Sequence, residues 1–257
     1  MLEDMSPQDM NNATKGKAKT PPDARVYAIG DVHGRLDLLD DLLGQIRADA
    51  DAALKGKKPP QRLVVVMLGD LIDRGPDSAG VLKRAAELLK GKHLPGFEAH
   101  ILKGNHEDAM ERFLADDDDG RQWRANGGRE ALQSYGLDAD QDSDALRAQL
   151  RDALPKAHRR VLGALKLSHV EGDYAFVHAG VRPGVAWNKQ SPDDLLWIRR
   201  EFTDSDADFG RCVVHGHTPT DAPEVRANRI GIDTRAWSSG VLTALVVDGK
   251  SRRFLST

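Results

Sequence analysis

The sequence has few of the features typical of secreted or membrane proteins. Its 257 residues include one cysteine, so no disulfide can form within the chain, which agrees with a reducing compartment. That residue, Cys212, lies in an apolar run and is expected to be a buried, inert thiol rather than a nucleophile. No apolar run approaches the ~20 residues needed to span a bilayer, and the first residues lack the basic-then-apolar order of a signal peptide. We therefore expect a cytoplasmic protein with no membrane partner.

A long block of basic residues is also missing. The formal net charge is −3, which argues against binding nucleic acid chiefly through its phosphate backbone. With 40% hydrophobic residues, a chain of this length can form one substantial core, so one α/β domain with one active site is expected. The sequence leaves the oligomeric state open.

Apolar periodicity divides the chain into a tail and a domain. Residues 1–23 are polar and without periodicity, which predicts a disordered tail or a cloning remnant before a catalytic domain over residues 24–257. From Arg25 onward, short apolar runs alternate with amphipathic stretches. The expected strands are 26–29, 63–68 and 98–102, and the expected helices between them are 36–48 and 78–89. This βαβαβ order is typical of an α/β sheet.

The second half of the chain begins with a charged, helical region. Residues 109–165 have a helical apolar period and are expected to form a helical insert or cap. The acidic run 116–119 indicates a solvated loop, with a weak cation site as the lesser alternative. Beyond the insert we expect two strands around residues 171–173, a helix at 193–198, and strands at 211–214, 229–232 and 241–247. Asp248-Gly249 predicts a hairpin turn into a last strand at 252–255.

Each strand predicted in the first half ends in a polar cluster. These clusters are Gly30-Asp31-Val32-His33-Gly34, Gly69-Asp70-Leu71-Ile72-Asp73-Arg74-Gly75 and Lys103-Gly104-Asn105-His106-Glu107. Two later strands run into His178-Ala179-Gly180 and His215-Gly216-His217. In an open α/β sheet, ligands gather at the carboxyl ends of the strands. The five clusters are therefore expected to converge on one site.

The converging side chains suit a metal ion. They offer carboxylate, amide and imidazole donors without thiolates, a set typical of manganese, iron or zinc. Taken singly, Asp31, Asp70 and Asn105 could each simply cap the following helix. Capping does not demand histidine at fixed offsets in four separate strand ends, so metal binding is favoured. His215 is expected to lie behind the ligands, with a direct ligand role as the lesser alternative.

Three strings in this sequence carry a family resemblance. Gly-Asp-x-His-Gly, Gly-Asp-x-x-Asp-Arg-Gly and Gly-Asn-His-Glu are intact and in order. On these strings, the chain over Arg25 to Leu255 resembles the calcineurin-like metallophosphoesterases, and within them the bacterial and phage phosphoprotein phosphatases. The resemblance implies a sandwich of two mixed β-sheets flanked by α-helices. It also implies two divalent metal ions, with manganese first and iron or zinc as alternatives.

The same resemblance implies the metal ligands. Position by position, Asp31 and His33 hold one ion, Asn105, His178 and His217 hold the other, and Asp70 bridges the two. It further implies that a metal-bridging hydroxide attacks phosphorus directly, so that no covalent phosphoenzyme forms.

Four further residues are implied to act on the substrate. Asp73 orients and charges His106, which protonates the leaving oxygen. Arg74 and Arg199 clamp the phosphate, because the planar guanidinium fork matches two phosphate oxygens. The sequence does not distinguish Arg199 from its neighbour Arg200.

One position departs from the family pattern. Relatives commonly read Ile-Asp-Thr-Gly-Ala where this chain has Arg235 in place of the glycine. If that position needs a positive φ, Arg235 is strained or the turn is rebuilt. A tolerated surface turn is favoured, and a charge added at the pocket rim is the alternative. Trp123 and Trp187 are expected to pack in the core rather than line a substrate groove.

Two substrate classes compete. The favoured function is a serine/threonine protein phosphatase acting on phosphorylated proteins or peptides, with phosphotyrosine as a further substrate. The alternative is a symmetrical dinucleoside polyphosphate (diadenosine tetraphosphate) hydrolase. Relatives with that activity usually lack the Asp-Arg pair of the second string and end the third in aspartate, whereas this chain has Asp73, Arg74 and Glu107. A silent scaffold that binds phosphorylated partners is disfavoured because the ligand set is complete.

Overall fold

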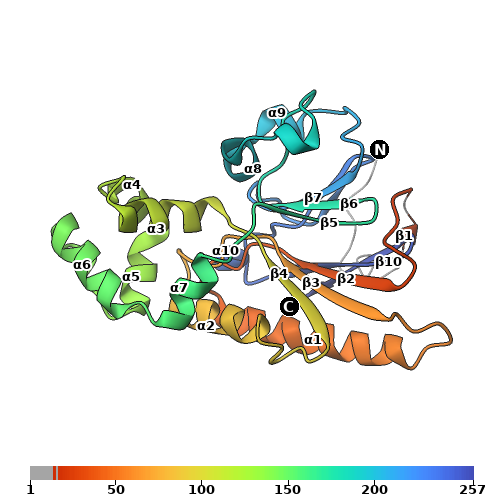
Figure 1. Ribbon diagram of the computed structural model, residues 1–257, viewed down its shortest axis with the longest axis horizontal. Helices are drawn as coiled ribbons and strands as arrows, with labels where there is room; N and C mark the ends of the chain where they lie inside the picture. Colours follow the sequence, from red (N-terminus) through yellow and green to blue (C-terminus); the bar gives the residue numbers. More distant parts are fainter. Residues whose placement is uncertain (1–13, 16) are drawn as a thin grey trace.

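The architecture rests on strands that are apolar on both faces. In the computed structural model, which describes residues 14, 15 and 17–257, two β-sheets pack against each other (Figure 1). Along the second strand, Val26 and Ala28 enter a core shared by both sheets, whereas Tyr27 and Ile29 enter a core beneath helices. Because side chains alternate between the faces of a strand, this pattern places the strand in the middle layer of the molecule.

The first sheet is mixed and has six strands. Their order is β1 (Thr14–Lys15), β11 (Ser251–Ser256), β10 (Thr243–Asp248), β2 (Ala24–Ile29), β3 (Arg62–Met67) and β4 (Phe97–Ile101). Strands β2, β3 and β4 are parallel, which confirms the predicted βαβαβ opening. Asp248 pairs with Ser251, so the hairpin loop is Gly249-Lys250 with Gly249 at φ 57°. The turn therefore lies one residue later than predicted.

The second sheet is also mixed and has five strands. Their order is β5 (Ser168–Glu171), β6 (Tyr174–Val177), β7 (Cys212–His215), β9 (Arg229–Gly231) and β8 (Glu224–Val225). Strands β6, β7 and β9 are parallel, and the outer two strands are antiparallel to their neighbours. Cys212 is buried at the start of β7, and burial raises the pKa of its thiol. This confirms the expectation of a buried cysteine.

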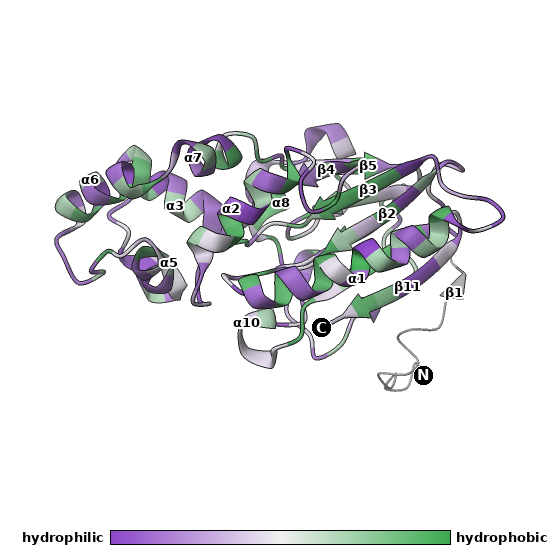
Figure 2. Cartoon of the chain, turned by 90° about the horizontal axis from the view of Figure 1, so that it is seen from below, coloured by the Kyte–Doolittle hydropathy of each residue, from purple (hydrophilic) through white to green (hydrophobic). Residues whose placement is uncertain are grey.

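Helices cover the outer faces of both sheets (Figure 1). Helices α1 (Leu36–Leu54) and α2 (Ser78–Leu88) lie along the first sheet, and α8 (Pro192–Trp197) and α9 (Arg200–Thr203) lie over the second. The short helix η3 (Trp187–Lys189) packs through Trp187 on the same small core as α8 and α9. Figure 2 shows α1 beside the strands, and its buried residues, Leu39, Leu42, Leu43, Ile46 and Ala50, follow a helical period. No helix in the described part of the chain is both long and apolar enough to cross a membrane.

The expected insert forms a helical lobe at one end of the sandwich (Figure 1). Its elements are α3 (Asn105–Ala115), α4 (Arg121–Trp123), η2 (Arg124–Gly128), α5 (Arg129–Ser134), α6 (Ser143–Ala153) and α7 (Lys156–Leu162). The acidic run 116–119 is an exposed loop, as predicted. One further helix, α10 (Ala236–Ser239), follows the second sheet.

Part of the predicted tail is ordered, which corrects its boundary. Thr14 and Lys15 form an antiparallel pairing with β11, whose outer edge would otherwise be unpaired. Thr20 donates from its backbone N–H to the carbonyl of Gly249 at 3.0 Å. The chain therefore joins the fold before Asp23. Residues 1–13 and 16 of the predicted tail lie outside the described residues.

Candidate metal centre

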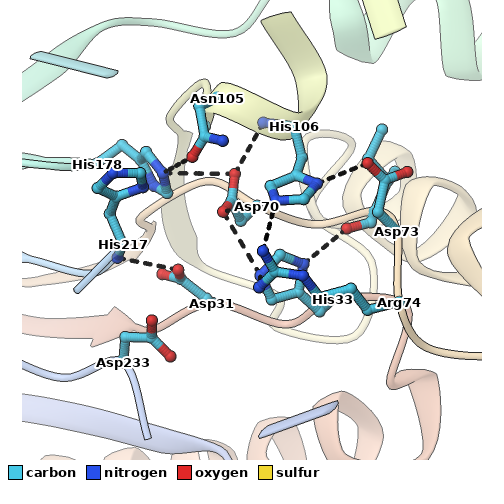
Figure 3. Close-up of polar contacts among 12 residues, drawn as sticks. Asp31, His33, Asp70, Asp73, Arg74, Asn105, His106, His178, His217 and Asp233 are labelled. Carbon is cyan, nitrogen blue, oxygen red and sulfur yellow. Dashed lines mark hydrogen bonds and ion pairs between the residues drawn. The ribbon is translucent and has the colours of Figure 1, made fainter. Parts of the chain in front are cut away.

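Five strand ends meet at one place between the two sheets. Strands β2, β3 and β4 supply residues from the first sheet, and β6 and β7 supply residues from the second. The side chains brought together are all buried: Asp31, His33, Asp70, Asn105, His106, His178 and His217. Figure 3 shows Asp70 at the middle of this group. The convergence expected from the strand-end clusters is confirmed.

The histidine that follows β6 presents a lone pair to two oxygens. His178 Nδ1 donates to the carbonyl of Leu68 at 3.0 Å, so Nε2 carries no proton when the ring is neutral. Burial lowers the pKa of His178 and favours that neutral form. Its Nε2 lies 2.9 Å from Asn105 Oδ1 and 3.4 Å from Asp70 Oδ1. Three acceptors therefore face one another without a proton between them, an arrangement that a cation would satisfy.

His33 repeats this arrangement on the other side of Asp70. Its Nδ1 donates to the carbonyl of Ile72 at 2.9 Å, and burial lowers the pKa of His33 to about 3. Its Nε2 lies 3.5 Å from Asp70 Oδ2. Ligand atoms of His33, Asp70 and His106 lie within 4.8 Å of one another, and the same holds for Asp70, His178 and His217. Asp70 belongs to both groups, so its carboxylate lies between two candidate cation positions.

Unpaired buried atoms complete the fit to a metal. Asp31 Oδ2 accepts the backbone N–H of His217 at 3.0 Å, but Asp31 Oδ1 and His217 Nε2 have no hydrogen-bond partner among the described residues. Burial, followed by the charges of Asp233 and Asp70, raises the pKa of Asp31 well above its ordinary range. Leaving a buried polar atom unpaired costs roughly 1–3 kcal/mol. A divalent cation would remove both penalties, so this set of residues could hold metal.

Glu107 joins the loops that follow β3 and β4. Its side chain is fully buried, and Oε1 accepts the N–H groups of Leu71 and Ile72 at 2.8 and 3.2 Å. Its Oε2 accepts the N–H groups of Asp70 and Gly104 at 2.9 and 2.8 Å. Burial and the charge of Asp70 raise the pKa of Glu107 to about 8, whereas the four N–H donors favour its carboxylate form. Glu107 thereby fixes the backbone on which the central aspartate is carried.

A buried carboxylate and imidazole lie beside the candidate ligands. His106 Nδ1 donates to Asp73 Oδ2 at 2.6 Å, and Trp123 Nε1 donates to the same oxygen at 2.8 Å. Burial opposes protonation of His106, but the carboxylates of Asp70 and Asp73 outweigh it and raise the pKa of the ring. Asp73 therefore fixes the orientation of the imidazole, and Trp123 fixes Asp73. Trp123 is buried against Phe113, as predicted, but it also lines the pocket beside His106, which the core prediction did not include.

Two arginines reach the same centre. Arg74 lies with Nη1 2.8 Å from His33 Nε2 and with Nη2 3.0 Å from His106 Nε2. Both Arg199 and Arg200 are exposed, but Arg199 donates from Nη1 to the carbonyl of His217 at 3.1 Å, whereas Arg200 begins α9. The geometry therefore brings Arg199, rather than its neighbour, to the candidate ligands.

Backbone strain is concentrated around these residues. Of the eight described residues other than glycine that have positive φ, six lie at or beside the centre: His33, Asp70, Asp73, Arg74, His217 and Arg235. Such conformations cost of order 1–3 kcal/mol each and are typical of functional sites. Gly69 lies beside Asp70 and has φ +99°, a conformation that favours glycine. A Cβ atom added at Gly69 would lie 2.5 Å from the backbone nitrogen of Gly104, so no larger residue fits there.

Comparison with known proteins agrees with this geometry. The sequence profile of the calcineurin-like phosphoesterases matches residues 24–238, which is most of the chain. The chain belongs to the calcineurin-like phosphoesterase family. It is therefore a metallophosphoesterase, and the predicted resemblance and the sandwich of two mixed sheets are both confirmed.

Individual relatives of this calcineurin-like phosphoesterase differ in their substrates. Serine/threonine-protein phosphatase 2 of Escherichia coli is 28% identical over 230 residues, which are 85% of this chain and 90% of that protein. The asymmetrical bis(5'-nucleosyl)-tetraphosphatase PrpE of Halalkalibacterium halodurans is 26% identical over 237 residues, 84% of this chain and 87% of that protein. A serine/threonine phosphatase structure from Saccharomyces cerevisiae has a TM-score of 0.54 at 16% identity, covering 91% of this chain and 80% of that one. The structural likeness shows the fold, and the two relatives leave the substrate open.

The departure at Arg235 lies on the rim of the phosphoesterase centre. Arg235 adopts φ 57° in the left-handed region, so this position does need a positive φ. Its side chain pairs with Asp221 and lines a pocket of about 450 Å³ together with Arg74 and Trp237. Arg235 is exposed, as the predicted surface turn requires, and it also brings a charged side chain to the pocket rim, so the two interpretations hold together.

The structure describes two more predicted positions of the phosphoesterase, and one residue of the centre was missed. His215 is buried with Nδ1 3.0 Å from the carbonyl of Gly216 and belongs to neither group of candidate ligands. Trp187 is half-buried and packs at the edge of a small core under α8 and α9, so the core prediction holds only in part. Asp233 was not predicted, although it follows β9 as the other site residues follow their strands. That position was the signal that would have identified it.

Proposed function

We propose that this metallophosphoesterase is a phosphomonoesterase that removes phosphate from phosphoserine and phosphothreonine in proteins. The observation that carries the proposal is the contact of 2.6 Å between Asp73 and His106 at the edge of the centre. A seryl or threonyl alkoxide is a poor leaving group and needs a proton as its bond to phosphorus breaks. A buried imidazole whose pKa is raised by two carboxylates is suited to deliver that proton.

The candidate ligands divide into two sets. Asp31 and His33 would hold one ion, Asn105, His178 and His217 would hold the other, and Asp70 would contribute to both. When bound, two divalent ions acidify water and neutralise phosphoryl oxygens. The donor set of oxygen and nitrogen without thiolate supports manganese, with iron or zinc as alternatives that metal analysis would separate.

The protein's own groups hold the ester and the proton. Arg74 and Arg199 would clamp the non-bridging oxygens, since both guanidinium groups border the candidate ligands. Asp73 keeps the proton of His106 on Nδ1 in the neutral ring, so Nε2 is the atom that exchanges a proton with the substrate. Trp123 Nε1 holds the carboxylate in place.

The test varies the leaving group. His106→Asn should lower kcat/KM on a phosphoserine peptide by roughly 10²–10⁴-fold, the usual contribution of a positioned general acid. The loss on p-nitrophenyl phosphate should be much smaller, because nitrophenolate leaves without a proton. Asp73→Asn should show the same asymmetry in milder form. Metal content is measured in each variant, and equal losses on both substrates with the metal retained would rule out the general-acid role.

A second substrate class has a structural observation in its favour. Two half-exposed indoles, those of Trp197 and Trp237, flank the centre. Trp197 lines a pocket of about 140 Å³ with Asn105 and His106. Trp237 lines the pocket that contains Arg74. Stacking on such rings is a common way to hold nucleobases. The PrpE relatives act on bis(5'-nucleosyl) tetraphosphates asymmetrically, whereas the sequence suggested symmetrical cleavage as the alternative. One metal-loaded sample assayed on phosphopeptides and diadenosine tetraphosphate, with product analysis, would separate the two classes and the two modes of cleavage.

A further inference from the structure

The indole of Trp237 lies against the guanidinium of Arg74. The Cζ atom of Arg74 is 5.5 Å from the centre of the ring. This is within the ~6 Å over which a cation is attracted to an aromatic face. Trp237 is 43% exposed, so burial in the core does not account for its position. The contact joins α10, near the C-terminus, to the loop that follows β3.

The backbone that carries Trp237 is fixed on both sides. Arg35 donates from Nη1 to the carbonyl of Ala236 at 3.0 Å, which ties α10 to the loop after β2. Asp233 Oδ1 accepts the N–H of Arg235 at 2.9 Å, and Thr234 Oγ1 donates to the carbonyl of Val241 at 2.8 Å. The indole is therefore presented from a rigid turn and not from a loose loop.

The other contacts of Arg74 divide into two kinds. One kind uses His33 Nε2 and His106 Nε2, and the first of these atoms belongs to a candidate metal ligand. A lone pair that binds a metal ion cannot also accept a hydrogen bond from Arg74. The second kind, the backbone bond from Arg74 N to Gly127 O at 3.0 Å and the face of Trp237, does not compete with metal.

We infer that Trp237 is a positioning residue that holds the Arg74 guanidinium for the phosphate. The inference rests on the phosphate-binding role given to Arg74 in the proposed function. It adds a specific dependence of phosphate affinity on a residue 163 positions away in the sequence, at a turn where this chain departs from the family pattern. The contribution acts on binding, so it falls on KM and on product affinity more than on kcat.

The primary test measures binding of inorganic phosphate to the metal-loaded protein by calorimetry. Trp237→Ala should weaken phosphate binding by about 2-fold to 30-fold, the range expected for loss of one cation–π contact. Trp237→Phe keeps an aromatic face and should recover most of that affinity. KM should rise by a similar factor while kcat changes little. Wild-type phosphate affinity in Trp237→Ala would overturn the inference.

A double-mutant cycle with Arg74→Ala separates positioning from direct contact. If Trp237 acts through Arg74, adding Trp237→Ala to Arg74→Ala should cause no further loss of phosphate affinity. An undiminished further loss would mean that Trp237 contacts the ligand itself, and the positioning role would be wrong. The matched control is Trp197→Ala, because Trp197 is 44% exposed but borders His217 instead of Arg74. Its effect should add to that of Arg74→Ala.

These measurements also separate the inference from the proposed substrate. Phosphate is a product of any phosphomonoester substrate, so the cycle gives an answer whether or not the natural substrate is a phosphoprotein. The substrate assays and the His106→Asn comparison test the phosphoprotein proposal alone. Failure of one therefore does not imply failure of the other.

Discussion

The buried Glu107 carboxylate allows the cost of a single isosteric change to be worked out. Glu107→Gln keeps the shape of the side chain but replaces one acceptor oxygen with an NH₂ group. Each oxygen accepts two backbone N–H groups at 2.8 to 3.2 Å, so either amide orientation leaves two buried backbone donors unpaired and turns the NH₂ group of the glutamine toward them. At roughly 1–3 kcal/mol for each backbone donor, the free energy of unfolding should fall by at least about 2–6 kcal/mol. That is a large part of the roughly 5–15 kcal/mol typical of a domain.

Urea unfolding of the chelator-treated protein measures this cost without a contribution from bound metal. The midpoint should fall at an unchanged slope, because the same surface is exposed on unfolding. Glu111→Gln is the matched control, since Glu111 lies on the same helix but pairs with Lys103 near the surface. Loss of that ion pair should cost less than about 1 kcal/mol. A midpoint for Glu107→Gln no lower than that of the control would refute the reasoning.

Further predictions concern the centre and its surroundings. Asp70→Asn should abolish turnover, and metal analysis should find fewer than two ions per chain, while the circular dichroism spectrum stays that of the folded protein. Two tightly bound ions with near-normal activity would contradict the prediction. Arg199→Ala should raise KM and weaken inhibition by phosphate. If Arg200→Ala shows these effects instead, the phosphate-binding role belongs to Arg200. Burial, followed by the neighbouring His169, lowers the pKa of His100 from 6.5 to about 4. Below pH 6.5 the unfolded chain therefore binds more protons at this site, so stability should fall as pH drops toward about 4, and His100→Gln should flatten that fall in urea midpoints. An unchanged pH dependence would exclude this contribution.

The sequence reveals the centre because its side chains are fixed by local positions. Asp31, Asp70 and Asn105 each follow a strand whose apolar run is plain in the sequence, and parallel strands bring their carboxyl ends together. A strand end and a short string therefore determine where each donor lies. No information from distant parts of the chain is required.

The supporting contacts are not visible in this way because they join distant segments. Trp123 bonds to Asp73 across fifty positions, and its bond depends on how the helical lobe packs. Asp233 follows β9, which marks it as a candidate, but its approach to Asp31 depends on the order of strands in the second sheet. The ordering of Thr14 and Lys15 depends on an open sheet edge, which polar composition alone does not indicate. Composition and periodicity describe one segment at a time, whereas each of these contacts depends on how two distant segments pack together.

The loop that carries Asp73 and Arg74 is strained, and hydrogen bonds to neighbouring elements hold it in that conformation. Asp73 and Arg74 have φ 73° and 65°, a conformation that costs free energy in any residue with a Cβ. The N–H of Asp73 is held by Ser78 Oγ at 2.9 Å, and that of Arg74 by the carbonyl of Gly127 at 3.0 Å. Ser78 opens α2 and Gly127 belongs to the helical lobe, so the loop that carries Asp73 and Arg74 is shaped by elements on either side of it.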